Sequence, residues 1–331
     1  MDGIVSVSTP QLLTKLPELY KDGMTEFSVH DRSIASDKKF LQVLIECVEK
    51  KCPELFISLP VDVSVLDRPM IASLQNIYCS LEIELAGKIK KEGGKTLLLF
   101  DKKLYANKSA LLNNAGLVFG FDMEWGSQEG DTFKLFRDRL DFALSLYPNH
   151  IDFPQFETVS MPAGTGIYST KDLDFSCGMA FACRTFYTSG RAVPWFNEVL
   201  KPLKINPSSF FADFDEWQQC NNCSFITEFE PESVPHRELE KMQLAFLKEK
   251  YDEKHKSSLF SAVSDIVRLN GAFSRVVEEG EECIVETSYN PDELLSPYSS
   301  DIARFCENAC LEPCRVKVFA GESGPDYKII A

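Results

Sequence analysis

The sequence lacks any apolar stretch long enough to cross a bilayer, and its first residues lack the basic-then-apolar pattern of a signal peptide. Basic residues are also scarce: 35 Lys and Arg stand against 50 Asp and Glu, so the formal charge is -15. A surface of that sign repels phosphate backbones. We therefore expect neither a membrane nor a nucleic acid as a partner. The densest basic run, residues 88–95, is expected to cap a solvated helix end.

Internal repeats and low-complexity tracts are absent too, while apolar residues make up 44% of the chain and aromatic residues 11%. This composition excludes a disordered chain. A length of 331 residues suits one large domain with a smaller addition, or two domains. Eleven cysteines without a signal peptide indicate free thiols in a reducing compartment, and hence a cytoplasmic protein.

Strand and helix patterns alternate over the first half of the chain with short connections between them. Strands are predicted at residues 25–29, 55–59, 77–83, 116–121 and 151–153. The alternation predicts an α/β fold with a parallel sheet, since crossovers of this kind are nearly always right-handed. A partial (β/α) barrel over residues 1–170 is the preferred architecture, and an open doubly wound sheet is the alternative.

The pattern changes after residue 170. Residues 171–256 predict a helical extension, rich in aromatic side chains. Residues 257–331 predict a small α+β unit, with a strand at 284–287, a helix at 300–310 and a strand at 315–319. A unit of this size is small for an independent domain.

Polar side chains stand at the carboxyl ends of the predicted strands, where parallel barrels carry their chemistry. They are His30, Asp31, Asp62, Glu82, Glu84, Asp122 and Glu124. Carboxylates that converge at one mouth raise one another's pKa and favour cations or amine-bearing ligands. The alternative is that polar residues merely end the strands. Gly116 and Gly120 remove side chains where another backbone or a ligand comes close.

His150 and Asp152 flank the last predicted strand. A neutral histidine there would serve as a base or a ligand, although a lone histidine after Pro-Asn is more typical of a structural hydrogen bond.

Two groups of cysteines have metal-ligand spacing: Cys306, Cys310 and Cys314, and the pair Cys220 and Cys223. Positions 306 and 310 are expected to share a helix face. The thiolates would bind zinc or an auxiliary iron–sulfur cluster. The alternative is that cysteine simply fills an amphipathic helix.

The order of these elements resembles the radical S-adenosylmethionine superfamily, in particular members that follow a cobalamin-binding domain. Residues 23–26 (Gly-Met-Thr-Glu) resemble the turn into the family's second strand, and residues 80–82 (Ser-Leu-Glu) resemble the polar end of its fourth. Residues 116–120 (Gly-Leu-Val-Phe-Gly) resemble its glycine-spaced fifth strand, with Asp122 replacing a frequent proline. The resemblance covers about half the chain.

The resemblance implies S-adenosylmethionine as a cofactor, held through Glu26, Ser80, Glu82, Gly116 and Gly120. It implies a substrate cavity shaped by His30, Asp31, Asp122 and Glu124.

The family's cluster motif, Cys-x3-Cys-x2-Cys after a first strand, has no counterpart here, because no cysteine precedes Cys47. We therefore expect a truncated or degenerate relative that is not catalytic as this chain alone. A cluster-bearing or cobalamin-binding partner, or a missing N-terminal segment, would supply what is absent. The alternatives are a non-catalytic barrel that binds a small molecule or a partner, and a metal-dependent barrel enzyme that uses the acidic mouth.

Overall fold

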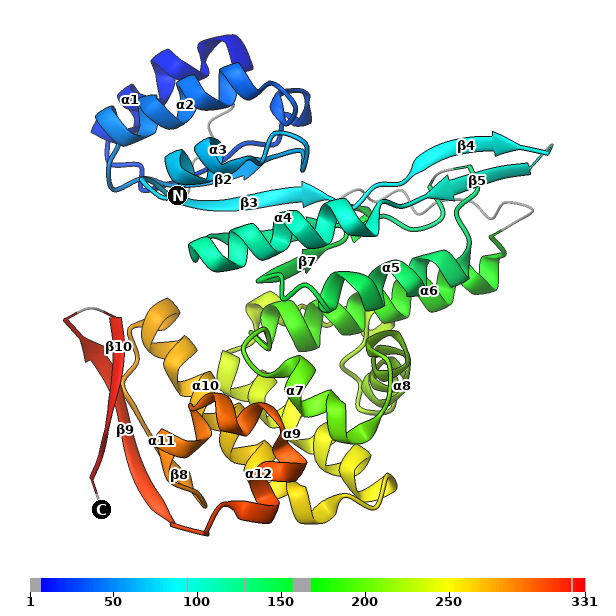
Figure 1. The fold of residues 1–331 in the computed structure, drawn as a ribbon, viewed down its shortest axis with the longest axis vertical. Coiled ribbons are helices and arrows are strands. Elements are labelled where there is room, and N and C mark those ends of the chain that lie inside the picture. The colour runs from blue at the N-terminus through cyan, green and yellow to red at the C-terminus, as the bar shows by residue number, and fades with distance from the viewer. Residues whose placement is uncertain (1–6, 94, 128, 157–167, 323, 331) are drawn as a thin grey trace. The chain divides into compact units, whose positions relative to one another are not determined.

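The computed structural model describes residues 7–93, 95–127, 129–156, 168–322 and 324–330 (Figure 1). The chain forms two compact units. The first unit comprises residues 1–131 and 146–161, and the second comprises residues 132–145 and 162–331. The second unit thus includes one helix, α5 (Phe133–Leu144), that lies inside the predicted barrel segment.

A five-stranded parallel sheet forms the centre of the first unit, in the order β1-β2-β3-β6-β7. The strands are β1 (Glu26–Ser28), β2 (Phe56–Pro60), β3 (Tyr78–Glu84), β6 (Val118–Asp122) and β7 (His150–Asp152). All four pairings are parallel. The prediction of one parallel sheet from these five segments is confirmed.

Helices flank this sheet (Figure 1). In the first unit they are α1 (Leu12–Lys21), α2 (Lys38–Lys51), α3 (Arg68–Leu74) and α4 (Lys102–Ala115). Asp37, Asp67 and Asp101 start α2, α3 and α4 by accepting hydrogen bonds from backbone N–H groups of the first turn. The strand order follows the chain without reversal, whereas a doubly wound sheet reverses its order at a switch point.

The two faces of the sheet differ in chemistry because side chains alternate along each strand. One face is apolar and buried: Ile57, Leu59, Cys79, Leu81, Ile83, Phe119, Phe121 and Ile151. The other face carries Ser58, Ser80, Glu82, Glu84, Gly120, Asp122, His150 and Asp152. The apolar face forms part of the core, and the polar face carries the side chains that are candidates for function.

The basic run at residues 88–95 does not cap a helix. It forms most of a hairpin of β4 (Lys88–Glu92) and β5 (Lys95–Leu99), which is a separate antiparallel sheet. Ile89 lies between Lys88 and Lys90, an alternation that is typical of a strand. Gly93, at φ +59°, then forms the turn. Every residue of β4 is exposed, so the charges remain solvated.

The second unit begins with helices around an aromatic core. They are α5, α6 (Thr170–Cys183), α7 (Phe196–Leu200), α8 (Pro207–Cys220) and α9 (His236–Glu253). Phe186, in a π-helical segment after α6, is fully buried. It makes edge-to-face contacts with Phe196, Phe210 and Phe214 at centroid distances of 6.1, 4.9 and 5.0 Å. The predicted helical extension therefore has an aromatic core of its own.

The C-terminal part of this unit is an antiparallel sheet, β10-β9-β8, that contacts the long helix α10 (Phe260–Glu279). Its strands are β8 (Cys283–Thr287), β9 (Cys314–Gly321) and β10 (Gly324–Ile329). Two short helices, α11 (Pro291–Leu294) and α12 (Ile302–Asn308), connect β8 to β9. The predicted strand–helix–strand is present, and β10 is an additional strand. Among the described residues, no helix has the length and apolar character needed to span a membrane.

Candidate functional site

His150 lies in a row of aligned residues that crosses the polar face of the sheet. The pairing register aligns Glu82 of β3 with Gly120 of β6, and Gly120 with His150 of β7. Glu82 and His150 are thus two strands apart, about 10 Å between backbones. A side-chain contact between them must pass over Gly120.

Gly120 provides the space for that contact. A Cβ atom at this position would lie 2.0 Å from Cε1 and 2.2 Å from Nδ1 of His150. The imidazole ring therefore occupies the volume that any side chain at residue 120 would need. The prediction that a glycine here admits a close neighbour is correct, and the neighbour is the ring of His150.

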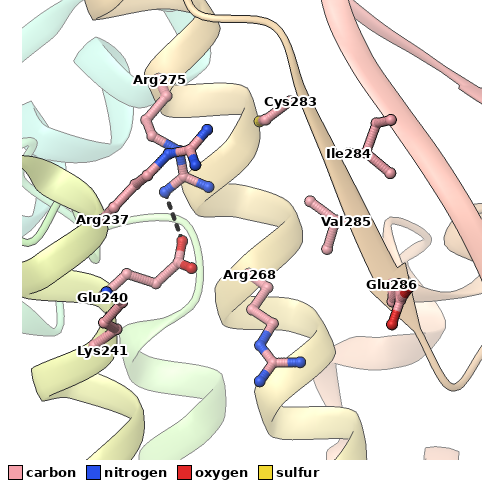
Figure 2. Close-up of a pocket in the computed structure, with 9 residues that line it drawn as sticks. All are labelled: Arg237, Glu240, Lys241, Arg268, Arg275, Cys283, Ile284, Val285 and Glu286. Atoms are coloured by element: carbon pink, nitrogen blue, oxygen red, sulfur yellow. Dashed lines mark hydrogen bonds and ion pairs between the residues drawn. The ribbon is translucent and has the colours of Figure 1, made fainter.

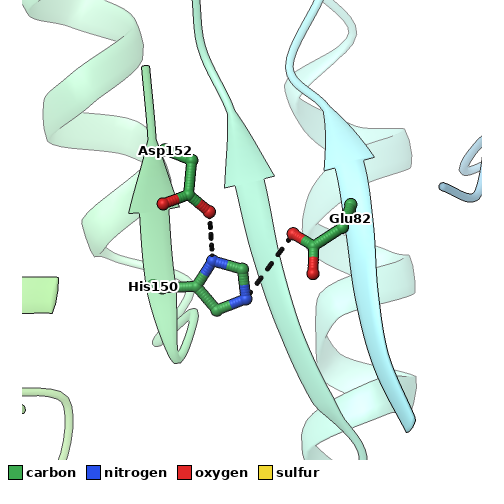
Figure 3. A group of neighbouring side chains, drawn as sticks. All are labelled: Glu82, His150 and Asp152. Atoms are coloured by element: carbon green, nitrogen blue, oxygen red, sulfur yellow. Dashed lines mark hydrogen bonds and ion pairs between the residues drawn. The ribbon is translucent and has the colours of Figure 1, made fainter. Parts of the chain in front are cut away.

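Both nitrogens of the His150 ring have partners (Figure 3). Nδ1 lies 2.5 Å from an oxygen of Asp152. Nε2 lies 3.1 Å from Oγ of Ser80 and 3.6 Å from an oxygen of Glu82. The ring bridges β7 to β3 across the intervening strand.

The carboxylate of Glu82 is held by two hydroxyl groups. Oε1 accepts hydrogen bonds from Ser58 at 2.9 Å and from Ser80 at 3.0 Å. Ser80 thus donates a hydrogen bond to Glu82 and can accept one from Nε2–H of His150. The result is a continuous chain of hydrogen bonds from Asp152 through His150 and Ser80 to Glu82.

This surrounding keeps His150 protonated. Burial alone would lower its pKa, but the hydrogen bond and charge of Asp152, with the charges of Glu82 and Asp122, raise the pKa to about 9. The carboxylates therefore hold a proton on the ring at neutral pH.

Asp122 occupies the next aligned row, with Glu84 on one side and Asp152 on the other. Its carboxylate pairs with the guanidinium of Arg32 at 2.5 Å. Burial raises the pKa of Asp122 to about 6, although Arg32 opposes that shift. Arg32 was not predicted, because it follows β1 in a short turn and its partner lies 90 residues away.

The structure places the other predicted carboxyl-end residues in different surroundings. Glu84 and Glu124 are exposed, and both lie close enough to act electrostatically on Arg32. Asp31 accepts hydrogen bonds from the N–H of Ser33 and the hydroxyl of Thr9.

Three further predicted residues lie apart from this network. His30 is exposed. Glu26 is the first residue of β1, at the opposite end of the sheet from Glu82, since it aligns with Phe56. Gly116 ends α4 with φ +68°, and nothing lies within 4 Å of a Cβ built there. Gly116 therefore ends the helix in the left-handed conformation that favours glycine. The approach of a ligand to this position stays a prediction.

The late cysteines are spread over several elements. Cys306 lies in α12, but the helix ends at Asn308, so Cys310 follows it and the predicted shared helix face is wrong. Cys314 begins β9 and is buried. Cys220 ends α8 and is exposed, and Cys223 is buried. Metal binding by these thiols stays a prediction.

Among the described residues, one group of three side chains has the spacing of metal ligands. The ligand atoms of Glu82, His150 and Asp152 all lie within 4.8 Å of one another. The sequence pointed to each of these residues separately. Their meeting depends on the register of β3, β6 and β7, which the sequence does not reveal.

Comparison with known proteins gives weak likenesses. No family model and no curated protein matches the sequence. Among solved structures, the chain is similar to the radical S-adenosylmethionine methyltransferase TsrM from Kitasatospora setae. In the structure with cobalamin and an iron–sulfur cluster bound, the match has 15% identity and a TM-score of 0.34 and covers 44% of this chain. The structure with tryptophan and an S-adenosylmethionine analogue gives 16% identity and the same score.

The chain spans 28% and 30% of the length of these two TsrM chains. It is also similar to a putative fructose-1,6-bisphosphate aldolase from Coccidioides immitis, with 11% identity, a TM-score of 0.30 and coverage of 76% of this chain and 90% of the other. TM-scores of this size do not establish a shared fold. Function has to be inferred from the geometry of the polar face.

Proposed function

We propose that this chain binds a small molecule with a positively charged group against the carboxylates of the polar face, and that it is not catalytic alone. S-adenosylmethionine, which carries an amine and a sulfonium, is the first candidate, because the order of the sequence elements resembles proteins that use it. The observation that supports the proposal most is the network of Glu82, His150 and Asp152 across Gly120.

The charge balance of this face supports a cationic ligand. Five carboxylates, those of Glu82, Glu84, Asp122, Glu124 and Asp152, stand against the two cations Arg32 and His150. His150 holds its proton because of this excess of negative charge. A bound cation would balance the negative charge of the carboxylates as the proton on His150 does, and the ring could then release its proton.

The iron–sulfur cluster that the resemblance implies does not fit the residues present. No three cysteines of the sequence have the Cys-x3-Cys-x2-Cys spacing. We therefore propose a binding role here, with any radical chemistry left to a cluster supplied by a partner or another segment.

Isothermal titration calorimetry tests the proposal. The ligands are S-adenosylmethionine and S-adenosylhomocysteine, which lacks the sulfonium charge. The variant Glu82→Gln removes one carboxylate of the network. Glu92→Gln is the matched control, because it removes the same charge from the exposed hairpin strand β4.

The proposal predicts that the wild type and Glu92→Gln bind S-adenosylmethionine alike. The wild type should bind S-adenosylhomocysteine about tenfold more weakly than S-adenosylmethionine. The Glu82→Gln variant should bind S-adenosylmethionine about tenfold more weakly than the wild type does. Each is the loss expected from one charge-assisted contact. Equal affinity for both ligands, or for both variants, would contradict it.

A divalent-metal-dependent enzyme is the second candidate, favoured by the ligand spacing of Glu82, His150 and Asp152. One imidazole and two carboxylates suit Mn²⁺ or Zn²⁺. Titration with MnCl₂, followed by water proton relaxation, distinguishes this function: saturable binding that Asp152→Asn abolishes would support it. A wild type that binds neither metal nor S-adenosylmethionine would contradict both functions.

A further inference from the structure

The second unit contains a pocket between α9, α10 and β8 (Figure 2). Its volume is about 330 Å³, which suits a small organic molecule. The side chains that line it are Arg237, Glu240, Lys241, Arg268, Arg275, Cys283, Ile284, Val285 and Glu286. Nothing in the sequence pattern predicted this site.

Cationic side chains outnumber acidic ones among the residues that line this pocket, although three of the four form ion pairs with glutamates. Four cationic side chains line it, against two acidic ones, while the whole chain has a formal charge of -15. Arg237 and Lys241 have partners of their own, Glu281 and Glu238. Arg268 is exposed and forms no hydrogen bond or ion pair with any residue that the structure describes. Its guanidinium is therefore available to a ligand.

Arg275 is the buried member of this set, with 4% of the residue exposed. One of its terminal nitrogens, Nη1, donates to an oxygen of Glu240 at 2.7 Å and lies 3.1 Å from Nδ1 of His236. Its Nε–H is buried and has no hydrogen-bond partner. A buried donor without a partner costs folding free energy. The guanidinium also interacts with the thiol of Cys283, which lines the pocket.

A glycine in the middle of α10 makes room for this arrangement. A Cβ at Gly271 would lie 2.1 Å from Oε2 of Glu240 and 3.3 Å from Nη1 of Arg275. Glycine inside a helix costs about 1 kcal/mol relative to alanine. The helix accepts this cost at the position where the Glu240–Arg275 pair approaches its backbone.

His236 is the neutral neighbour of Arg275. It is buried beside Arg275. Burial, Arg191 and Arg275 lower its pKa to about 4. The ring is neutral and accepts the hydrogen bond from Arg275. It adds no further positive charge to the pocket.

We propose that this pocket binds the phosphate group of a small phosphorylated molecule. Arginine side chains offer paired N–H donors that match phosphate oxygens. Arg268 supplies a free guanidinium, and Arg237 and Lys241 add charge at the rim. Ile284 and Val285 of β8, which also line the pocket, offer apolar contacts to the organic part of the ligand. The pocket belongs to the second unit, and the polar face of the parallel sheet belongs to the first.

Phenyl phosphate is a suitable probe because it combines a phosphate with an apolar ring. Inorganic phosphate and phenol separate the two contributions. Binding is measured by calorimetry and by ³¹P line broadening at low ionic strength. The variants are Arg268→Gln and Lys241→Gln. Lys248→Gln is the matched control, since Lys248 is also an exposed lysine of α9 in a short-range ion pair but does not line the pocket.

The proposal predicts that phenyl phosphate binds more tightly than inorganic phosphate and that phenol does not bind. Arg268→Gln should weaken the binding of phenyl phosphate about tenfold, and Lys241→Gln should weaken it a few-fold. Lys248→Gln should leave the affinity for phenyl phosphate unchanged. Absence of phenyl phosphate binding, or an equal loss in Arg268→Gln and Lys248→Gln, would overturn it.

Discussion

The imidazole ring of His150 occupies the space that a side chain on Gly120 would fill, with Cε1 of the ring 2.0 Å from the position of a Cβ atom. The two residues align on neighbouring parallel strands. This relationship lets β7 contact β3 across β6, and the site depends on it.

Replacement of Gly120 by alanine tests this dependence. The added methyl group must displace the ring, so we expect the free energy of unfolding to fall by about 1 to 3 kcal/mol. The displaced ring would lose its hydrogen bonds with Asp152 and Ser80, and its pKa should fall by a unit or more. Urea denaturation and NMR titration of the histidine Cε1 protons measure the two effects.

Gly116→Ala is the control for that experiment. It introduces strain at φ +68°, which also lowers stability by about 1 kcal/mol, but no atom lies near the new methyl group. Its His150 titration should match the wild type. If Gly120→Ala also left that titration unchanged, the ring would not depend on the space over Gly120.

The stability of the fold should depend on pH through His150. Its folded pKa of about 9 lies above the ordinary histidine value of 6.5, so its stabilisation is complete below about pH 6.5 and is lost as pH rises through 9. The stability difference between wild type and His150→Asn should shrink by roughly 2 to 3 kcal/mol between pH 6 and pH 10. A difference that stays constant over this range would show that His150 titrates normally.

Asp152 is expected to be the main source of the raised His150 pKa. Its hydrogen bond and its negative charge favour the protonated ring more strongly than Glu82 or Asp122 does. Asp152→Asn should therefore lower the His150 pKa by at least about one unit, whereas Asp62→Asn, beyond the carboxyl end of β2, should not. Equal titration curves for both variants would refute this assignment.

In the second unit, Gly271→Ala should destabilise the protein. Helix propensity alone predicts a gain of about 1 kcal/mol, but the methyl group would meet Glu240 and break its pair with Arg275. We expect a net loss of about 1 to 3 kcal/mol. In a Glu240→Ala background the same substitution should cost less, which a double-mutant cycle measures. Additive effects would show that the pair and the glycine are independent.

Reconstitution with iron and sulfide should not make this chain cleave S-adenosylmethionine, because the sequence contains no Cys-x3-Cys-x2-Cys motif. Chromatographic assay for 5′-deoxyadenosine under reducing, anaerobic conditions gives the answer. Turnover by the chain alone would show that other cysteines hold a competent cluster.

Much of the first unit follows from local signals in the sequence. Short apolar runs predicted the five strands of the parallel sheet. The carboxylates Glu82 and Asp122 were expected at strand ends because parallel strands share one edge. The prediction for residues 88–95 was wrong because charge suggested a helix end, while the alternation around Ile89 indicated a strand.

The contacts within the sites could not be predicted in the same way. The meeting of His150 with Glu82 depends on the pairing register, and one residue of slip would place His150 on the opposite face. The Arg32–Asp122 pair and the basic pocket join segments that are far apart in the chain. Residue spacing within one segment carries no information about such long-range contacts.

The titration of His150 with and without S-adenosylmethionine tests the central claim most directly. The chain has four histidines, and a His150→Asn spectrum assigns the resonance. If the cationic ligand binds against Glu82 and Asp152, saturating S-adenosylmethionine should lower the His150 pKa by at least about one unit, and S-adenosylhomocysteine should lower it less. A His150 pKa that stays at about 9 with the ligand bound would contradict the proposed binding site.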